Sequence, residues 1–292
     1  MTFSIVIPSY NGSKYIRQAI DSAINQSRKA DEIIISDDNS SDDTLIICQT
    51  YGEQIKIYSN LNGPSGFVNG WNNAIAHAKG DYISVLHQDD ILAPTFLEEA
   101  ERALTQYPDV KHLFVSCNYI NFNNKITHQP PFIDNITHLY TGNEYIELYI
   151  HFSNPRIHRC PGVITHKSIF EICKYREEAG HIADDDFFYR VGQYTTIIGI
   201  HKPLASYRNH SDSATGSLSD YKLNQKLFKD YLYQVKSWDE NILKNQKHRK
   251  YINQHVILHG KRLINYALKA KNYREVIKVL KSITLKNLIY SL

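Results

Sequence analysis

Short apolar, β-branched segments alternate with helical patterns through the first 116 residues, and this alternation constrains the fold more than any other feature of the sequence. A strand, a helix and a second strand within about 35 residues form a βαβ unit, whose strands lie parallel in one sheet. We therefore expect an α/β fold with a largely parallel sheet flanked by helices. The expected strands are Phe3–Ile7, Glu32–Ser36, Ile55–Tyr58, Tyr82–Leu86 and His112–Ser116.

The helices between these strands are expected from apolar residues at 3.6-residue spacing and from end signals. Asn11-Gly12 marks a turn, after which Ser13 can cap a helix. That helix would bury Ile16, Ala19, Ile20, Ala23 and Ile24. Further helices are expected at Asp42–Tyr51, at Val68–Ala78, and at a segment with Pro94 in its first turn that ends near Tyr107.

Beyond residue 120 the alternation is weaker. Asn121–Ile136 is typical of a loop, and Thr141-Gly142-Asn143-Glu144 is a capping box that should open a helix. Thr195–Ile200 is expected to be a late strand, and everything from Ser219 onward is expected to be helical, with Gly260 as its interior break. We therefore predict a catalytic-type domain at residues 1–217 and a helical C-terminal region at residues 218–292.

Charge divides the chain in the same way. Residues 218–292 hold 16 Lys and Arg against five Asp and Glu, a charge of +11, so residues 1–217 carry −8 of the net +3. A cation could offset the carboxylates of the acidic part, and the basic helices favour an anionic partner. The helices also carry apolar stripes. They can pack on the larger domain, dock peripherally on an anionic membrane face, or do both.

Other sequence features place the chain among soluble proteins of a reducing compartment. The spacing of the four cysteines matches no zinc or disulfide framework, and the first residues lack a signal peptide. No stretch approaches 18 apolar residues, so no membrane span is expected. We expect a cytoplasmic protein, at most bound to the inner face of the cell membrane. RNA binding is disfavoured, because no known module or basic aromatic platform occurs.

The first acidic cluster, Asp37-Asp38-Asn39-Ser40-Ser41-Asp42-Asp43, follows the second expected strand. Ligands of parallel sheets bind at the carboxyl ends of the strands, so Asp37 and Asp38 should lie at the binding edge. A carboxylate there can accept a hydrogen bond from a ribose hydroxyl or a base N–H. The alternative is helix capping by Asn39 or Ser40, which leaves two adjacent carboxylates unexplained.

The second cluster, His87-Gln88-Asp89-Asp90, follows the fourth expected strand. Adjacent carboxylates repel each other unless a cation neutralises them, and Mg²⁺ or Mn²⁺ would also bridge phosphate oxygens. The alternative is a turn in which Asp90 caps the following helix. Two acidic loops at one sheet edge favour a metal-assisted nucleotide site.

Two later clusters are less specific. Asp184-Asp185-Asp186 can supply a general base, or can be the acidic first turn of a helix. Tyr207-Arg208-Asn209-His210 can place Arg208 on a phosphate and His210 on a metal, or can be a surface loop.

Taken in order, these clusters resemble the family 2 glycosyltransferases with the GT-A fold. The resemblance covers roughly residues 3–215. It runs through Ile5-Val6-Ile7-Pro8-Ser9-Tyr10-Asn11, Glu32-Ile33-Ile34-Ile35-Ser36-Asp37-Asp38-Asn39-Ser40 and Ala78-Lys79-Gly80-Asp81-Tyr82-Ile83. Gly63-Pro64-Ser65-Gly66 with Trp71-Asn72 is similar to a subset of the family.

For the donor, the resemblance implies that Asp38 contacts the nucleobase, with Pro8 and Tyr10 lining the same pocket. Asp89 would be the metal-binding carboxylate of the family's DxD motif, with Asp90 in support. His87 stands where the first Asp of that motif is usual, which alters the ribose contact expected there.

For the reaction, the resemblance implies that Asp184 is the catalytic base, and Asp185 is a rival for the role because the family's Glu-Asp pair is Ala183-Asp184 here. Arg208 and His210 would lie near the diphosphate, and His210 would complete the metal site. The implied reaction inverts the anomeric carbon as an acceptor hydroxyl displaces the nucleoside diphosphate.

The resemblance favours a UDP- or dTDP-sugar as donor. The acceptor would be a saccharide or a lipid-linked saccharide in the assembly of bacterial surface polysaccharide, lipopolysaccharide or capsule. A non-catalytic nucleotide-sugar binding protein and a nucleotidyltransferase are the alternatives. The second lacks its usual Gly-rich phosphate loop near the first strand, and the absence of a G-x-G-x-x-G motif disfavours a dehydrogenase.

Overall fold

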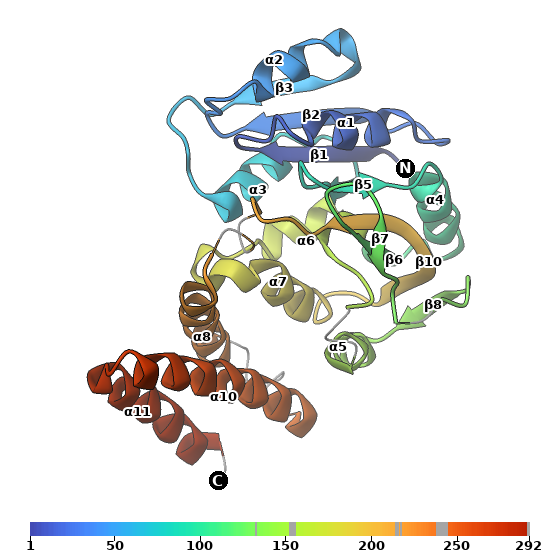
Figure 1. Ribbon diagram of the computed structural model, residues 1–292. Helices are drawn as coiled ribbons and strands as arrows, with labels where there is room; N and C mark the ends of the chain where they lie inside the picture. Colours follow the sequence, from blue (N-terminus) through green and yellow to red (C-terminus); the bar gives the residue numbers. More distant parts are fainter. Residues whose placement is uncertain (132, 152–155, 214–215, 217, 238–244, 291–292) are drawn as a thin grey trace. The chain divides into compact units, whose positions relative to one another are not determined.

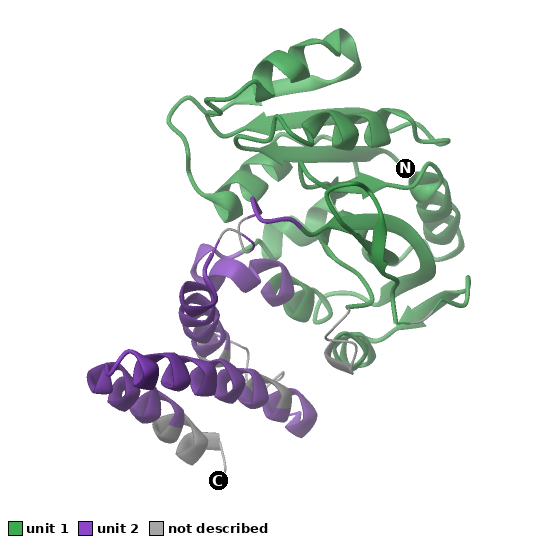
Figure 2. Cartoon of the chain, viewed as in Figure 1, with its two compact units in different colours: residues 1–175, 187–209 green, residues 176–186, 210–292 purple. Residues whose placement is uncertain are grey.

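The computed structural model describes residues 1–131, 133–151, 156–213, 216, 218–237 and 245–290. Two compact units account for them (Figure 2). Unit 1 comprises Met1–Tyr175 and Phe187–Asn209, and unit 2 comprises Arg176–Asp186 with the described part of His210–Leu292.

A single mixed sheet organises unit 1 (Figure 1). Its first half is parallel, in the order β3-β2-β1-β4. Apolar β-branched residues fill the two central strands, which are buried along their whole length, as strands covered on both faces must be. These strands are β1 (Phe3–Ser9), β2 (Glu32–Asp37), β3 (Lys56–Ser59) and β4 (Tyr82–Val85).

The second half continues from β4 in the order β9-β6-β10-β5. β9 runs antiparallel to both β4 and β6, whereas β10 runs parallel to β6 and antiparallel to β5 and β8. β7 pairs with β6. The strands are β5 (Ile91–Leu92), β6 (His112–Ile120), β7 (Ile126–His128), β8 (Thr137–Tyr140), β9 (Val163–His166) and β10 (Ile197–Arg208).

The helices of unit 1 bury their apolar faces on this sheet, and one continuous core joins α1 and α4 to the central strands. The capping box is confirmed at the start of α5, where the Thr141 hydroxyl and amide donate to the Glu144 carboxylate at 2.8 Å. The helices are α1 (Ile16–Ile24), α2 (Thr44–Gln49), η1 (Gly52–Gln54), α3 (Phe67–Ala76), α4 (Phe96–Gln106), α5 (Gly142–His151), η2 (Cys160–Gly162) and α6 (Lys167–Ile172).

Unit 2 contains η3 (Glu177–Ile182) and three long helices, α8 (Asp220–Ser237), α10 (Gln246–Lys269) and α11 (Tyr273–Tyr290). α7 (Ala183–Val191) follows η3 along the chain. The boundary predicted from the sequence lies at residue 217, whereas unit 2 also includes Arg176–Asp186. Within unit 2, η3 is linked to α8, since the His181 amide donates to Asp230 at 2.9 Å. Among the described residues, no helix is long and apolar enough to cross a membrane.

Three local predictions are wrong. The segment Asn121–Ile136, expected to be a loop, contains the strand β7, which pairs with β6. Ser13 does not cap α1; its amide donates to Asp42 at 3.0 Å, and α1 begins after Tyr15 without a side-chain cap. Gly260 does not break a helix but lies inside α10, where a Cβ would come within 2.5 Å of Ile283 and 3.1 Å of Phe228. Its lack of a side chain permits close packing of neighbouring helices in unit 2.

Candidate active site

The two acidic loops of the N-terminal half flank the carboxyl end of β1. This follows from topology, since β1 lies between β2 and β4 and its last residue, Ser9, is in register with Asp37. The β1–α1 loop joins them. The Tyr10 amide donates to Gln88 Oε1 at 2.9 Å, and the Asn11 amide donates to Ser40 Oγ at 2.9 Å. The expected edge for a ligand is thus one hydrogen-bonded surface.

Asp37 holds this edge together. Its side chain is fully buried, and its oxygens accept hydrogen bonds from Ser9 Oγ at 3.0 Å, from the Ser40 amide at 2.9 Å and from Ser40 Oγ at 2.5 Å. Full burial, rather than the number of hydrogen bonds, keeps this carboxylate from a ligand, since Asp38 accepts four hydrogen bonds and keeps 6% exposure. The placement of Asp37 fits a positioning role better than the ligand contact expected from sequence.

Asp38 faces the loop that follows β3. Its Oδ1 accepts from Asn60 Nδ2 at 2.7 Å, and its Oδ2 accepts from the Ser65 amide at 2.6 Å. Asn39 takes a left-handed conformation, φ 68°, and its side-chain Nδ2 donates to the Gly63 carbonyl at 3.1 Å. The carboxylate is therefore anchored between two loops at the end of the sheet, beside polar groups from both.

Pro8 and Tyr10 differ in exposure. Pro8 is buried within β1, opposite Ser36 of β2, whereas Tyr10 is 44% exposed on the loop beyond the strand. Gln88 fixes the Tyr10 backbone from both sides, because its Nε2 also donates to the Tyr10 carbonyl at 3.1 Å. Of these two residues, the tyrosine ring is the one that a bound base could stack on.

The second acidic loop gathers three ligand-type side chains. One possible metal-ligand atom from each of His87, Asp89 and Asp90 lies within 4.8 Å of the other two, and His87 Nδ1 is 3.7 Å from Asp90 Oδ2. Asp90 is buried, and neither its Oδ2 nor His87 Nε2 has a hydrogen-bond partner among the residues that the structure describes. Burial, reinforced by neighbouring Asp89, raises the pKa of Asp90 well above its usual value.

A buried carboxylate oxygen with no partner is costly unless something outside the protein satisfies it. A divalent cation fits here, because two carboxylates and an imidazole are ligands such ions accept. Burial lowers the pKa of His87 despite nearby Asp89, so its imidazole is neutral and able to ligate at neutral pH. These residues form an acidic cluster suited to a divalent metal.

Arg208 does not fit the phosphate contact expected of it. Its side chain is fully buried, and its guanidinium donates to the Asp89 carbonyl at 2.7 Å and to Gln18 Oε1 at 2.9 Å. It also donates to Asn121 and Asn124 and lies 4.5 Å from the Tyr15 ring centroid. With its donors engaged inside unit 1, Arg208 positions the acidic loop; its amide also donates to Asp90 Oδ1 at 2.8 Å.

Trp71 is part of this site although sequence reasoning gave it no role. Its ring stacks on His87 with centroids 4.9 Å apart and planes 21° apart, and it meets Tyr175 edge-on at 5.2 Å. The neighbouring Asn72 donates to the Tyr175 carbonyl at 2.9 Å. The only sequence signal was the Trp71-Asn72 pair after a Gly-Pro loop. The indole fixes the orientation of the imidazole at the acidic cluster.

Asp184 and Asp185, the residues predicted to act as catalytic base, belong to unit 2, as does His210. The sheet edge around β1 belongs to unit 1. Asp186 is buried, and its two carboxylate oxygens accept hydrogen bonds from Nε and Nη2 of Arg176, each at 2.9 Å. Asp185 is buried, whereas Asp184 is half-buried and accepts the Asp185 amide at 2.9 Å. The roles of Asp184, Asp185 and His210 stay predictions.

A family model described as "Glycosyl transferase family 2" matches residues 4–170, more than half of the chain. The chain belongs to glycosyl transferase family 2. An uncharacterised glycosyltransferase of Rickettsia typhi is 28% identical to this family member over 247 residues, which cover 84% of this chain and 76% of the relative. A chondroitin synthase of Pasteurella multocida is 42% identical over 98 residues, covering 32% of this chain and 10% of the synthase.

Solved structures agree with this family's GT-A fold. A structure of S. aureus TarS in complex with UDP-GlcNAc matches with a TM-score of 0.60 and 16% identity, covering 98% of this chain and 92% of that one. The mannosyltransferase PcManGT from Pyrobaculum calidifontis, in complex with GDP-Man and Mn²⁺, matches with a TM-score of 0.59 and 15% identity, covering 98% and 86%. The expected fold class is confirmed, and the family 2 member is a glycosyltransferase.

Proposed function

We propose that this glycosyltransferase moves a sugar from a nucleoside diphosphate sugar to an acceptor hydroxyl with inversion at the anomeric carbon. The observation that carries the proposal is the edge of the sheet around β1. It sets the anchored carboxylate of Asp38 on one side and, on the other, the Oδ2 of buried Asp90, which has no hydrogen-bond partner in the described part of the chain. The nucleobase would lie on the Asp38 side, and the diphosphate would lie on the Asp90 side.

Asp38 is proposed to select the base. A carboxylate accepts hydrogen bonds but cannot donate them, so it suits the N3–H of uracil or thymine. Tyr10 offers a ring for stacking, and Asn60 and Ser65 hold the carboxylate in place. A UDP- or dTDP-sugar is therefore the proposed donor, and the TarS complexes with UDP and UDP-GlcNAc support the uridine choice.

A divalent cation, Mn²⁺ or Mg²⁺, is proposed at His87, Asp89 and Asp90. When bound, such an ion offsets the negative charge that grows on the departing diphosphate. Asp89 and Asp90 supply the hard oxygen ligands, and His87 supplies a nitrogen that favours Mn²⁺ over Mg²⁺. The Mn²⁺ in the PcManGT complex supports this choice. His210 is proposed to complete the set.

Asp184 is proposed as the base that removes the acceptor proton, with Asp185 as its rival. Asp184 is the more accessible of the two, and a base must reach the hydroxyl it deprotonates. The acceptor is proposed to be a saccharide, free or lipid-linked, in bacterial surface polysaccharide, lipopolysaccharide or capsule assembly. Similarity to a chondroitin synthase supports a polysaccharide product. The +11 charge of residues 218–292 supports a peripheral contact with an anionic membrane.

The test is sugar transfer or hydrolysis measured as release of nucleoside diphosphate from a panel of UDP-, dTDP-, GDP- and CDP-sugars, each with Mn²⁺, Mg²⁺ or EDTA. The proposal expects release from one uridine or thymidine donor that stops with EDTA. Binding of nucleotide without any release would favour a non-catalytic binding protein. Release of pyrophosphate from a nucleoside triphosphate and a sugar phosphate would favour a nucleotidyltransferase.

A further inference from the structure

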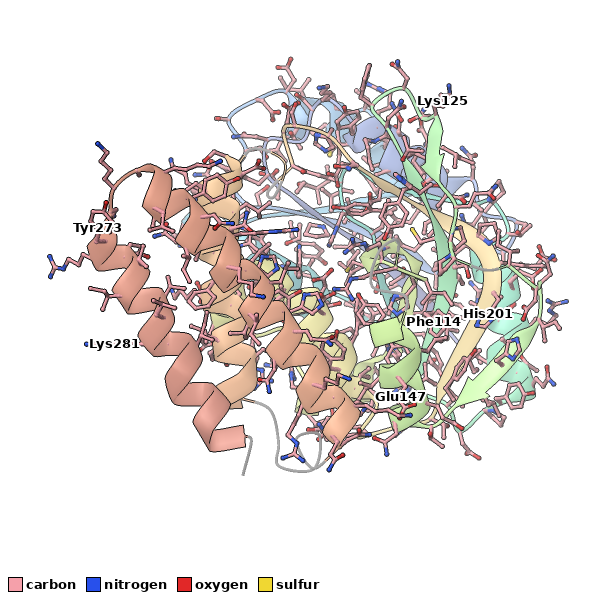
Figure 3. The ribbon with its side chains drawn as sticks, turned by 60° about the horizontal axis from the view of Figure 1, so that its bottom comes forward. Phe114, Lys125, Glu147, His201, Tyr273 and Lys281 are labelled. Atoms are coloured by element: carbon pink, nitrogen blue, oxygen red, sulfur yellow. The ribbon has the colours of Figure 1, made fainter. Side chains whose placement is uncertain are left out.

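A second group of metal-ligand side chains lies at the outer edge of the unit 1 sheet, on elements that carry none of the proposed donor-site residues His87, Asp89 and Asp90. It consists of Asp134, just before β8, His138 on β8 and His201 on β10. β8 and β10 are antiparallel, with His138 in register with Gly199, so His138 and His201 are diagonal neighbours on one face. Figure 3 shows His201 on β10 with Phe114 nearby.

The three ligand atoms converge. Asp134 Oδ2 lies 2.8 Å from His138 Nε2 and 3.4 Å from His201 Nδ1, and all three atoms lie within 4.8 Å of one another. Two ligands at the usual Zn²⁺ bond lengths, in tetrahedral geometry, are about 3.4 Å apart. The His201–Asp134 separation already has this length, and the His138–Asp134 separation needs to open by only about half an ångström; the two histidine nitrogens lie within 4.8 Å of each other.

The far sides of two of the three ligands, His201 and Asp134, are held as metal ligands usually are. His201 Nε2 lies 2.9 Å from the Tyr140 hydroxyl, which can fix the tautomer that leaves Nδ1 facing Asp134. Asp134 Oδ1 accepts the Ile136 amide at 2.9 Å, so Oδ2 is turned toward the histidines. A Cβ on Gly199 would come within 2.7 Å of Tyr140, so the glycine lets that ring take its place.

The exposure of the three side chains also suits a metal. His201 is 1% exposed, while Asp134 and His138 are about one-third exposed, so an ion can enter from solvent and keep a water.

We infer that Asp134, His138 and His201 form a binding site for a borderline divalent cation of the Zn²⁺ type, separate from the acidic cluster at the donor edge. Two imidazoles and one carboxylate, with an open fourth position, form a ligand set that Zn²⁺ accepts and that Mg²⁺ does not favour. The bound ion would fasten the short edge strand β8 and the preceding turn to β10.

The test uses the full chain, stripped of metal and titrated with Co²⁺ as a spectroscopic stand-in for Zn²⁺. The inference expects one Co²⁺ with intense tetrahedral ligand-field bands at this site, displaced by one Zn²⁺, in addition to any Co²⁺ held at His87, Asp89 and Asp90. His138→Ala should weaken this binding by at least about 100-fold, because loss of even an outer partner costs about 10- to 100-fold. Tyr140→Phe, which keeps the ring, should weaken it about 10-fold.

His128→Ala is the matched control, since it removes another exposed histidine of the same sheet and should leave the Co²⁺ spectrum unchanged. Asp89→Asn should also leave it unchanged, because that residue belongs to the other cluster. Unaltered Co²⁺ affinity in a folded His138→Ala variant, or loss of the bands in Asp89→Asn alone, would overturn the inference. Far-UV circular dichroism confirms that each variant is folded.

Discussion

Replacing Asp90 by Asn should stabilise the metal-free protein and abolish its response to metal. Among the described residues, the Oδ2 of buried Asp90 has no hydrogen-bond partner, and burial together with Asp89 raises its pKa, so an ionised carboxylate is unfavourable there without a cation. Asn keeps the acceptor for the Arg208 amide and removes the charge. The new amide group still lacks an ideal partner, since His87 Nδ1 is 3.7 Å away, so the gain should be only about 1 kcal/mol.

In EDTA, that gain corresponds to a rise in Tm of about 2–4 °C. Added Mn²⁺ should reverse the order. An ion present at about 100 times its Kd stabilises the native state by about 2.7 kcal/mol, and the variant, with one carboxylate fewer, should gain little of this. The assay is thermal denaturation followed by circular dichroism, with and without Mn²⁺.

Asp37→Asn is the matched control, because Asp37 is an equally buried aspartate of the same edge whose oxygens are satisfied by Ser9 and Ser40. An amide there would set donors against donors and cost about 1–3 kcal/mol in EDTA. Opposite signs for the two variants are the expected result. If Asp90→Asn is destabilised in EDTA as much as Asp37→Asn, Asp90 is a structural anion and the metal argument fails.

We make three further predictions, at Asp184, Glu32 and Arg208. Asp184→Asn should reduce transfer below detection while nucleotide affinity stays within about twofold, and full activity of that variant would move the base to Asp185. Burial would raise the pKa of Glu32, but hydrogen bonds from Lys56, the Lys79 amide and Ser4 lower it to about 2, so its contribution to stability is present above pH 4.5 and disappears as pH falls toward 2. Glu32→Gln should therefore flatten acid unfolding in that window, and an unchanged acid limb would refute the assignment. Arg208→Lys should lower the Tm and also weaken Mn²⁺ binding, because Lys cannot replace a planar guanidinium that makes several hydrogen bonds. If the variant loses only affinity for the diphosphate, with Tm and Mn²⁺ binding unchanged, Arg208 contacts the phosphate instead.

The parallel half of the fold could be predicted from sequence because its signals are local. The β1 and β2 segments are continuous apolar runs, and α1 carries its buried residues at helical spacing. β9 could not be found this way. Its short segment pairs antiparallel between β4 and β6, and nothing within Val163–His166 specifies partners so distant in sequence.

The site shows the same division. Asp38 and Asp89 were predicted as ligand residues because acidic residues directly after strands lie at the ligand edge of a parallel sheet, and these roles stay predictions. The phosphate contact predicted for Arg208 could not take account of acceptors far away in the chain, including Gln18, 190 residues earlier. The stacking of Trp71 on His87 likewise exists only after folding. Local patterns identified the chemistry, but tertiary contacts determine which polar residues act as ligands and which position them.

Isothermal titration calorimetry of UDP and dTDP binding, with Mn²⁺ or with EDTA, would show whether the sheet edge around β1 is a metal-dependent donor site. We predict that one of these nucleotides binds with Mn²⁺, and that binding weakens at least tenfold with EDTA or in Asp89→Asn. Asp38→Asn should weaken the same nucleotide by about 1–3 kcal/mol, the cost of losing a charged hydrogen-bond acceptor. Equal binding in Mn²⁺ and EDTA would remove the metal from the account. Failure of both nucleotides to bind in either condition would contradict the proposed donor site.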